Sequence, residues 1–152
     1  MSTETLIALF RRDLARLRRE IELYNQEHRL WLTAGAIPNS AGNLCLHLLG
    51  NLNTYIGQQL GRTGYVRERE LEFSLRHVPR AELLLRIDQT SEMVTATLAS
   101  LPAASLPAEY PLLVLEHKTS TEYLLIHLAT HLTYHLGQIN YHRRLLDHVS
   151  DQ

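Results

Sequence analysis

The segment Thr130-His131-Leu132-Thr133-Tyr134-His135-Leu136-Gly137-Gln138 lies inside a longer stretch with helical periodicity, from about Ser120 to Asp147. Its two histidines are four residues apart, so on a helix they lie one above the other on the same face. Two imidazoles in this arrangement can bind one metal ion, as the histidine pairs of helical zinc sites do. Because two ligands rarely suffice, the segment predicts a third ligand elsewhere, and His47 is the candidate.

The predicted helix around this segment has a polar stripe beside an apolar one. At roughly 100° per residue, its histidines fall within about 80° of one another, with Gln138 among them; they are His127, His131, His135 and His142. Leucines and Ile139 fill the neighbouring arc, which indicates burial on that side. Thr119 followed by Glu122 three residues later is typical of a capping box, so Thr119 is the expected N-cap.

A second helix is predicted over residues 41–60, and it has the same design. Ser40 is its expected N-cap, and His47, Asn51 and Tyr55 share a polar stripe next to several leucines. Cys45 points nearly opposite His47 and is not counted as a ligand. Gly50 and Gly57 lower helix propensity, which indicates close helix approach or access to a cavity.

Two further helices are predicted, over about residues 3–32 and from Pro79 to about Leu101. The glycine-containing segment 61–64 is expected to end the second helix, and the charged segment 65–77 is expected to connect to the third with at most a short helical turn. The apolar residues 112–115 could form a short strand or an extended segment over the bundle. Four helices with short connections predict an all-α fold, a four-helix bundle, as a single domain over residues 1–152.

The composition excludes several classes of function. The chain has 152 residues and a net charge of −1, so no overall positive field favours nucleic acid or an anionic membrane. No apolar run approaches the roughly 20 residues of a membrane span, and no secretory signal pattern is present. The one cysteine, Cys45, excludes an internal disulfide and suits a reducing compartment. We expect a cytoplasmic protein without nucleic-acid or membrane partners.

In a bundle, facing helices lie about 8–10 Å apart, so imidazoles from two helices can meet at one ion. His47, His131 and His135 would form a three-histidine site with open positions, the arrangement of a catalytic metal. Zinc, nickel, iron or copper would suit such ligands. His127 could be a fourth ligand, could support one of the ligands, or could have a structural role. His142 lies too far along the helix to be a ligand. Asn51, Tyr55 and Gln138 could contact a ligand or make ordinary polar contacts; no partnered carboxylate is identifiable, and the remaining histidines are expected to be exposed.

The segment His131 to Gln138, together with His47, resembles the DinB-like superfamily of metal-binding four-helix bundles. Three other stretches carry the resemblance: residues 39–51 (NSAGNLCLHLLGN), residues 67–73 (RERELEF) and residues 79–84 (PRAELL). The resemblance implies a divalent metal on His47, His131 and His135, and a homodimer. Characterised relatives include S-transferases and isomerases that use thiols such as bacillithiol or mycothiol, and the closer match is an uncharacterised branch. Leu136 stands where many relatives have a basic residue.

Two functional hypotheses follow, beside a helical bundle whose histidines only pack. The first is a metal-dependent enzyme of the S-transferase type, with zinc, nickel or iron on the three histidines and a low-molecular-weight thiol cosubstrate acting on a small-molecule substrate. The alternative is a non-enzymatic, stress-related protein that binds metal. Metal loading separates both from the packing hypothesis, and thiol-dependent turnover separates the first from the second.

Overall fold

The computed structural model describes residues 2–148, and in them the predicted all-α class is confirmed. Four long helical segments form a four-helix bundle: α1 (Thr3–Leu23), the continuous run of α2 (Ala41–Leu52), η2 (Asn53–Gln58) and α3 (Gln59–Gly61), α5 (Arg80–Ser100) and α6 (Thr121–Leu146). A short helix, α4 (Arg69–Ser74), interrupts the connection before α5, as the charged segment predicted. The described residues contain no strand, only an isolated antiparallel bridge between Glu109 and Ser120.

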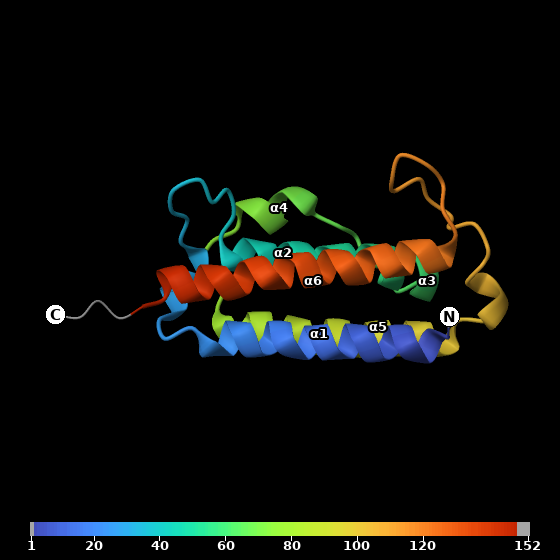
Figure 1. The fold of residues 1–152 in the computed structure, drawn as a ribbon, viewed down its shortest axis with the longest axis horizontal. Coiled ribbons are helices and arrows are strands. Elements are labelled where there is room, and N and C mark those ends of the chain that lie inside the picture. Colours follow the sequence, from blue (N-terminus) through green and yellow to red (C-terminus); the bar gives the residue numbers. More distant parts are fainter. Residues whose placement is uncertain (1, 149–152) are drawn as a thin grey trace.

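The four long segments form a ring in which α1 contacts α5, α5 contacts α2, α2 contacts α6 and α6 contacts α1. The colours of Figure 1 show that α1 and α6 run in one direction and α2 and α5 in the other. The chain therefore has to return along the bundle between α2 and α5. Residues 62–79 make this crossover, and α4 lies on the outer side of α2.

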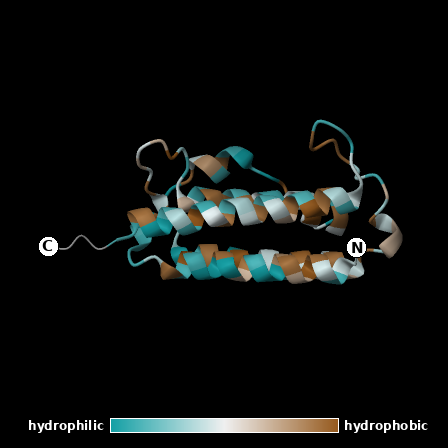
Figure 2. Ribbon diagram, in the orientation of Figure 1, coloured by the Kyte–Doolittle hydropathy of each residue, from teal (hydrophilic) through white to brown (hydrophobic). Residues whose placement is uncertain are grey.

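The core lies where the apolar stripes of the four segments meet. Each segment contributes fully buried side chains, among them Phe10, Leu52, Leu83 and Leu132. Figure 2 shows hydrophilic and hydrophobic residues alternating along α1 and α6, as expected for amphipathic helices with one buried face. None of the described helices combines the length and apolar content required to cross a membrane.

The first helix is shorter than its periodicity predicted. It ends at Leu23, and after a bend the chain forms a short 3₁₀ helix, η1 (Glu27–Trp31). The break has a tertiary cause, because Tyr24 is buried and the carboxylate of Asp147 accepts hydrogen bonds from the backbone N–H groups of Asn25 and Gln26. The apolar pattern continues through η1 since Leu30 and Trp31 are also buried.

The second helical segment begins as predicted, with Ser40 Oγ accepting a hydrogen bond from Asn43 N. Its π-helical part, η2, has no counterpart in the prediction. The segment 61–64 ends the helix as predicted, but the left-handed residue at the helix end is Arg62, with φ of 50°, and not a glycine. Gly61 instead allows close approach to α5, since a Cβ there would lie 2.5 Å from Thr97 Oγ1.

The last helix is capped by Ser120 and not by Thr119. Ser120 Oγ accepts a hydrogen bond from Tyr123 N, whereas the Thr119 carbonyl accepts one from Tyr110 N beside the isolated bridge. This pairing holds Thr119 in an extended segment and moves the helix start by one residue. The apolar residues before it form no strand, and Leu112 and Leu113 are exposed.

Candidate metal centre

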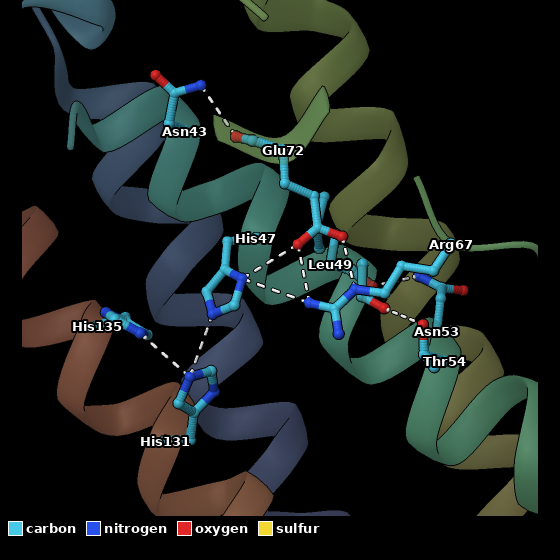
Figure 3. A network of polar contacts seen from close by, with 10 residues as sticks. Asn43, His47, Leu49, Asn53, Thr54, Arg67, Glu72, His131 and His135 are labelled. Atoms are coloured by element: carbon cyan, nitrogen blue, oxygen red, sulfur yellow. Dashed lines mark hydrogen bonds and ion pairs between the residues drawn. The ribbon is translucent and has the colours of Figure 1, made fainter. Parts of the chain in front are cut away.

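Three imidazoles converge between α2 and α6 (Figure 3). His47 Nε2 lies 3.3 Å from His131 Nε2, which lies 3.1 Å from His135 Nε2. One ring nitrogen of each histidine lies within 4.8 Å of the others. The i, i+4 pair is brought together by helix geometry alone, whereas His47 is brought to it by the contact of α2 with α6. The three histidines singled out by sequence are therefore neighbours that could bind a metal ion.

The pKa values of two of the three imidazoles, those of His131 and His135, are lowered. The pKa of His131 is lowered to about 4, mainly by burial and in addition by the charges of its neighbours, first among them His135 and His47. Burial also lowers the pKa of His135, although its hydrogen bond with Gln138 partly offsets this effect. Neutral imidazoles with their Nε2 atoms facing one another have a lone pair available for a cation.

A buried carboxylate contacts the far side of His47. Glu72 on α4 has Oε1 3.1 Å from His47 Nδ1, and Arg67 donates from Nε to Oε2 and from Nη2 to Oε1, each at 2.8 Å. Burial raises the pKa of Glu72, but the hydrogen bonds from Arg67 and His47 lower it more, so the net pKa lies below its usual value. Glu72 is therefore ionised at neutral pH, and its Oε1 can accept a hydrogen bond from a protonated Nδ1 of His47.

Gln138 has the corresponding position beside His135. Its Oε1 lies 2.7 Å from His135 Nδ1, one helical turn away on α6. Because an amide oxygen only accepts, Nδ1 carries the proton and Nε2 carries the lone pair. With acceptors at Nδ1 of His47 and His135, the Nε2 lone pairs of both rings can point toward His131. A metal-binding histidine usually donates its other ring N–H to an acceptor in this way.

Two buried polar atoms near these residues have no hydrogen-bond partner among the described residues. They are Nδ1 of His131 and Oδ1 of Asn51, which lies one turn beyond His47 on α2. Buried polar groups normally have partners, so unpaired atoms beside a histidine cluster are typical of a site whose ligand or water completes the contacts. The donor set, its tautomers and these two atoms fit a divalent transition metal.

A family model described as Protein of unknown function (DUF1572) matches residues 4–150, nearly the whole chain. The chain belongs to this family. DUF1572 is a family with the DinB-like fold, so the predicted membership of the DinB-like superfamily is confirmed. Comparison with curated proteins and with solved structures gave no match.

The other candidate residues of this DUF1572 member separate into near and distant groups. His127 stacks on His131 with ring centroids 6.3 Å apart, outside the group of three. Tyr55 lies under the guanidinium of Arg67, 5.8 Å from ring centroid to Cζ. Cys45 is buried, and burial raises the pKa of its thiol to about 12. His142 is buried at the other end of α6, and the remaining histidines are exposed as expected.

The sequence interpretation was wrong in finding no partnered carboxylate. Glu72 lies in a charged segment with Glu68 and Glu70, both of them exposed, so composition does not distinguish it. A signal was nevertheless present at Gly50, where a Cβ would overlap Glu72 Oε2. The sequence thus predicted correctly that another helix approaches α2 closely at Gly50, but it did not indicate that the approaching group is the Glu72 carboxylate.

Proposed function

We propose that this DUF1572 member is a metal-dependent enzyme of the S-transferase type, with a divalent transition metal on His47, His131 and His135. The observation that supports it most is the convergence of three Nε2 atoms, with oxygen atoms of Glu72 and Gln138 next to Nδ1 of His47 and His135. Three neutral imidazoles suit zinc, nickel or iron and leave coordination positions open.

The residues around the histidines would serve a small thiol cosubstrate. When bound, the metal supplies the positive charge that favours a thiolate over a thiol. The thiol sulfur would then form a bond to an electrophilic carbon of the second substrate as the bond from that carbon to its leaving group breaks. The thiol proton would go to the leaving group or to water. The unpaired Asn51 Oδ1 could accept a hydrogen bond from the cosubstrate. The centroid of the Phe73 ring lies 4.9 Å from that of the His47 ring, so Phe73 would keep one side of the site apolar.

The proposal includes a homodimer. Large apolar side chains lie exposed along one stripe of α6 at Tyr123, Tyr134, Tyr141 and Leu145, and their spacings of 11, 7 and 4 residues keep them on one side of a helix. Exposed large apolar side chains on one side of a helix support an interaction site. Sedimentation equilibrium of the untagged protein tests this part, and a monomer across the accessible concentrations would remove it.

Metal content is the first test of the function. Elemental mass spectrometry on untagged protein should give about one ion per chain, lost in His47→Ala and in His131→Ala. His127→Ala is the matched control, because it removes the adjacent imidazole that lies outside the group of three. A metal-free wild type after reconstitution with zinc, nickel and iron would contradict the site.

Thiol chemistry is tested on the cobalt-substituted protein. A physiological low-molecular-weight thiol should shift the visible spectrum, and a panel of electrophiles should be consumed only when thiol and metal are both present. Metal binding without either response would favour a non-enzymatic metal-binding protein instead.

A further inference from the structure

The crossover between α2 and α5 does more than connect two helices. Because these helices run in the same direction, residues 62–79 pass along the outer side of α2 (Figure 1), and α4 is packed against that helix. Asn43 fixes α4 there, since its Nδ2 donates to the carbonyl oxygens of Glu72 and Leu75, each at 2.9 Å. The position of Glu72 along α2 is therefore set by main-chain contacts that do not involve its carboxylate.

The surface of α2 is shaped to receive that carboxylate. Gly50 lies one turn below His47 on the same helix, and the Cβ of any other residue there would occupy the space of Glu72 Oε2. The Glu72 side chain is only 7% exposed. A carboxylate in such a place is unfavourable unless it is paired and hydrogen-bonded.

Arg67 provides this pairing from the same crossover. Its Nε and Nη2 bind the two carboxylate oxygens in the bidentate arrangement that arginine favours. The guanidinium also lies over the ring of Tyr55, which supports it from the α2 side. One carboxylate oxygen, Oε1, remains shared between Arg67 and His47 (Figure 3).

The contacts of His47 Nδ1 allow two tautomers in principle. Nδ1–H can donate to Glu72 Oε1 at 3.1 Å, or an unprotonated Nδ1 can accept from Arg67 Nη2 at 3.4 Å. The second choice would place the Nδ1 lone pair against an ionised oxygen, whereas the first is a charge-assisted hydrogen bond. The geometry therefore favours the proton on Nδ1 and the lone pair on Nε2.

We propose that Arg67 and Glu72 form a positioning pair that holds the His47 ring as the Nδ1–H tautomer with Nε2 directed at His131 and His135. Both residues act through His47, so neither is a metal ligand. The consequence for metal binding rests on the proposed function, but the tautomer is a property of the metal-free protein and can be measured without it.

The first experiment is long-range ¹H–¹⁵N correlation NMR of the imidazoles in metal-free protein near pH 8, where histidines of ordinary pKa, about 6.5, are neutral. Wild-type His47 should show the pattern of the Nδ1–H tautomer. Glu72→Gln removes the charge, and Gly50→Ala displaces the carboxylate without removing it. Both should increase the Nε2–H fraction, while Glu70→Gln on the exposed side of α4 should not.

The second experiment measures the zinc affinity of the wild type, of the three variants above and of one further control variant, by competition with a chromophoric chelator. Loss of a partner that orients a ligating histidine lowers affinity about 10- to 100-fold, so Glu72→Gln and Gly50→Ala should bind zinc that much more weakly. Gly137→Ala is the control for adding a methyl group to a helical glycine, because a Cβ there has no neighbour within 4 Å. Circular dichroism establishes that each variant is folded.

The two experiments separate the possible failures. An Nε2–H tautomer in wild-type His47, or an unchanged tautomer in both Glu72→Gln and Gly50→Ala, would overturn the positioning pair. If the wild type binds zinc, an unchanged zinc affinity in both variants would also overturn it. A wild type that binds no zinc but shows the Nδ1–H tautomer, lost in the two variants, would reject the metal site and leave the positioning pair supported.

Discussion

Two histidines of helix α6, the partly buried His131 and the buried His142, lie in opposite polar environments. His142 has both ring nitrogens satisfied, because the Tyr24 hydroxyl lies 2.6 Å from Nδ1 and the Leu32 carbonyl lies 2.8 Å from Nε2. His131, eleven residues earlier, has Nε2 facing two other imidazoles and a buried Nδ1 without a partner among the described residues. Both side chains are on the same helix and both avoid bulk water.

The difference shows that burial does not identify a functional histidine. Burial lowers the pKa of both His131 and His142, so a low pKa is shared by the two environments. The partners distinguish them, since a hydrogen-bond donor and an acceptor complete His142, whereas Nε2 of His131 faces Nε2 of His47 and of His135 in a group that could hold a cation. His142 is therefore expected to serve stability, and His131 is a candidate ligand of the proposed metal site.

Reciprocal alanine variants give the largest expected effect on this comparison. His142→Ala should lower the free energy of unfolding by about 2–4 kcal/mol, since it opens a cavity and leaves the Tyr24 hydroxyl and Leu32 carbonyl without partners. His131→Ala should cost about 1 kcal/mol or less in metal-free protein, because the lost contacts of Nε2 are offset by the removal of a buried Nδ1 without a partner among the described residues.

Urea denaturation of both variants, with metal content measured on the same samples, checks the contrast. His142→Ala should keep the metal that His131→Ala loses. Equal losses of stability in the two variants would mean that His131 stabilises the fold as much as His142 does, which would contradict the contrast.

The pH dependence of stability gives a smaller effect. Burial lowers the pKa of folded His142 from 6.5, and this exceeds the opposing effects of the Leu32 hydrogen bond and the Asp147 charge. The unfolded chain therefore binds a proton below pH 6.5 that the folded chain does not, so this contribution to stability is present above that pH and is lost as pH falls. The slope is at most about 1.4 kcal/mol per pH unit for one proton.

Metal-free wild type and His142→Ala should consequently approach each other in stability between about pH 7 and pH 5. Urea titrations at several pH values measure the difference, and His131→Ala should retain the His142 contribution to the slope. A difference that stays constant or widens toward acid would mean that His142 is protonated in the folded protein.

Tyr24→Phe gives the smallest expected effect and the most local one. It removes only the hydroxyl that donates to His142 Nδ1, so the loss should be about 1 kcal/mol, the net worth of one buried hydrogen bond. Thermal unfolding detects a change of this size, and the zinc affinity should not move. A reduced zinc affinity in Tyr24→Phe would show that the His142 environment influences the metal site, and it would contradict the proposed independence of the two.

Much of the fold and half of the site were predictable because the signals are local. The spacing of His131 and His135 brings them together on any helix, and the apolar stripes indicate which sides of the helices are buried. The Ser40 cap and the start of α5 after Pro79 depend on neighbouring residues and were predicted correctly. The approach of His47 followed from the requirement that two amphipathic helices share one core, while its metal binding stays a prediction.

The features that the sequence did not reveal depend on residues far apart in the chain. The end of α1 depends on Asp147 and the buried Tyr24, and the N-cap of α6 depends on the bridge with residue 109. Glu72 could not be chosen from its acidic neighbours, because no local pattern tells which carboxylate a crossover will bring to a histidine 25 residues earlier.

By itself, the sequence determined four amphipathic helices, their approximate limits and a histidine pair on one face, since these follow from periodicity and spacing over a few turns. Only the tertiary structure decided the parallel course of α2 and α5 and the crossover it requires. That crossover places Arg67 and Glu72 behind His47, in the space that Gly50 leaves. The physical reason is that the burial and pairing of a carboxylate are properties of a packed assembly, which short-range pattern does not encode.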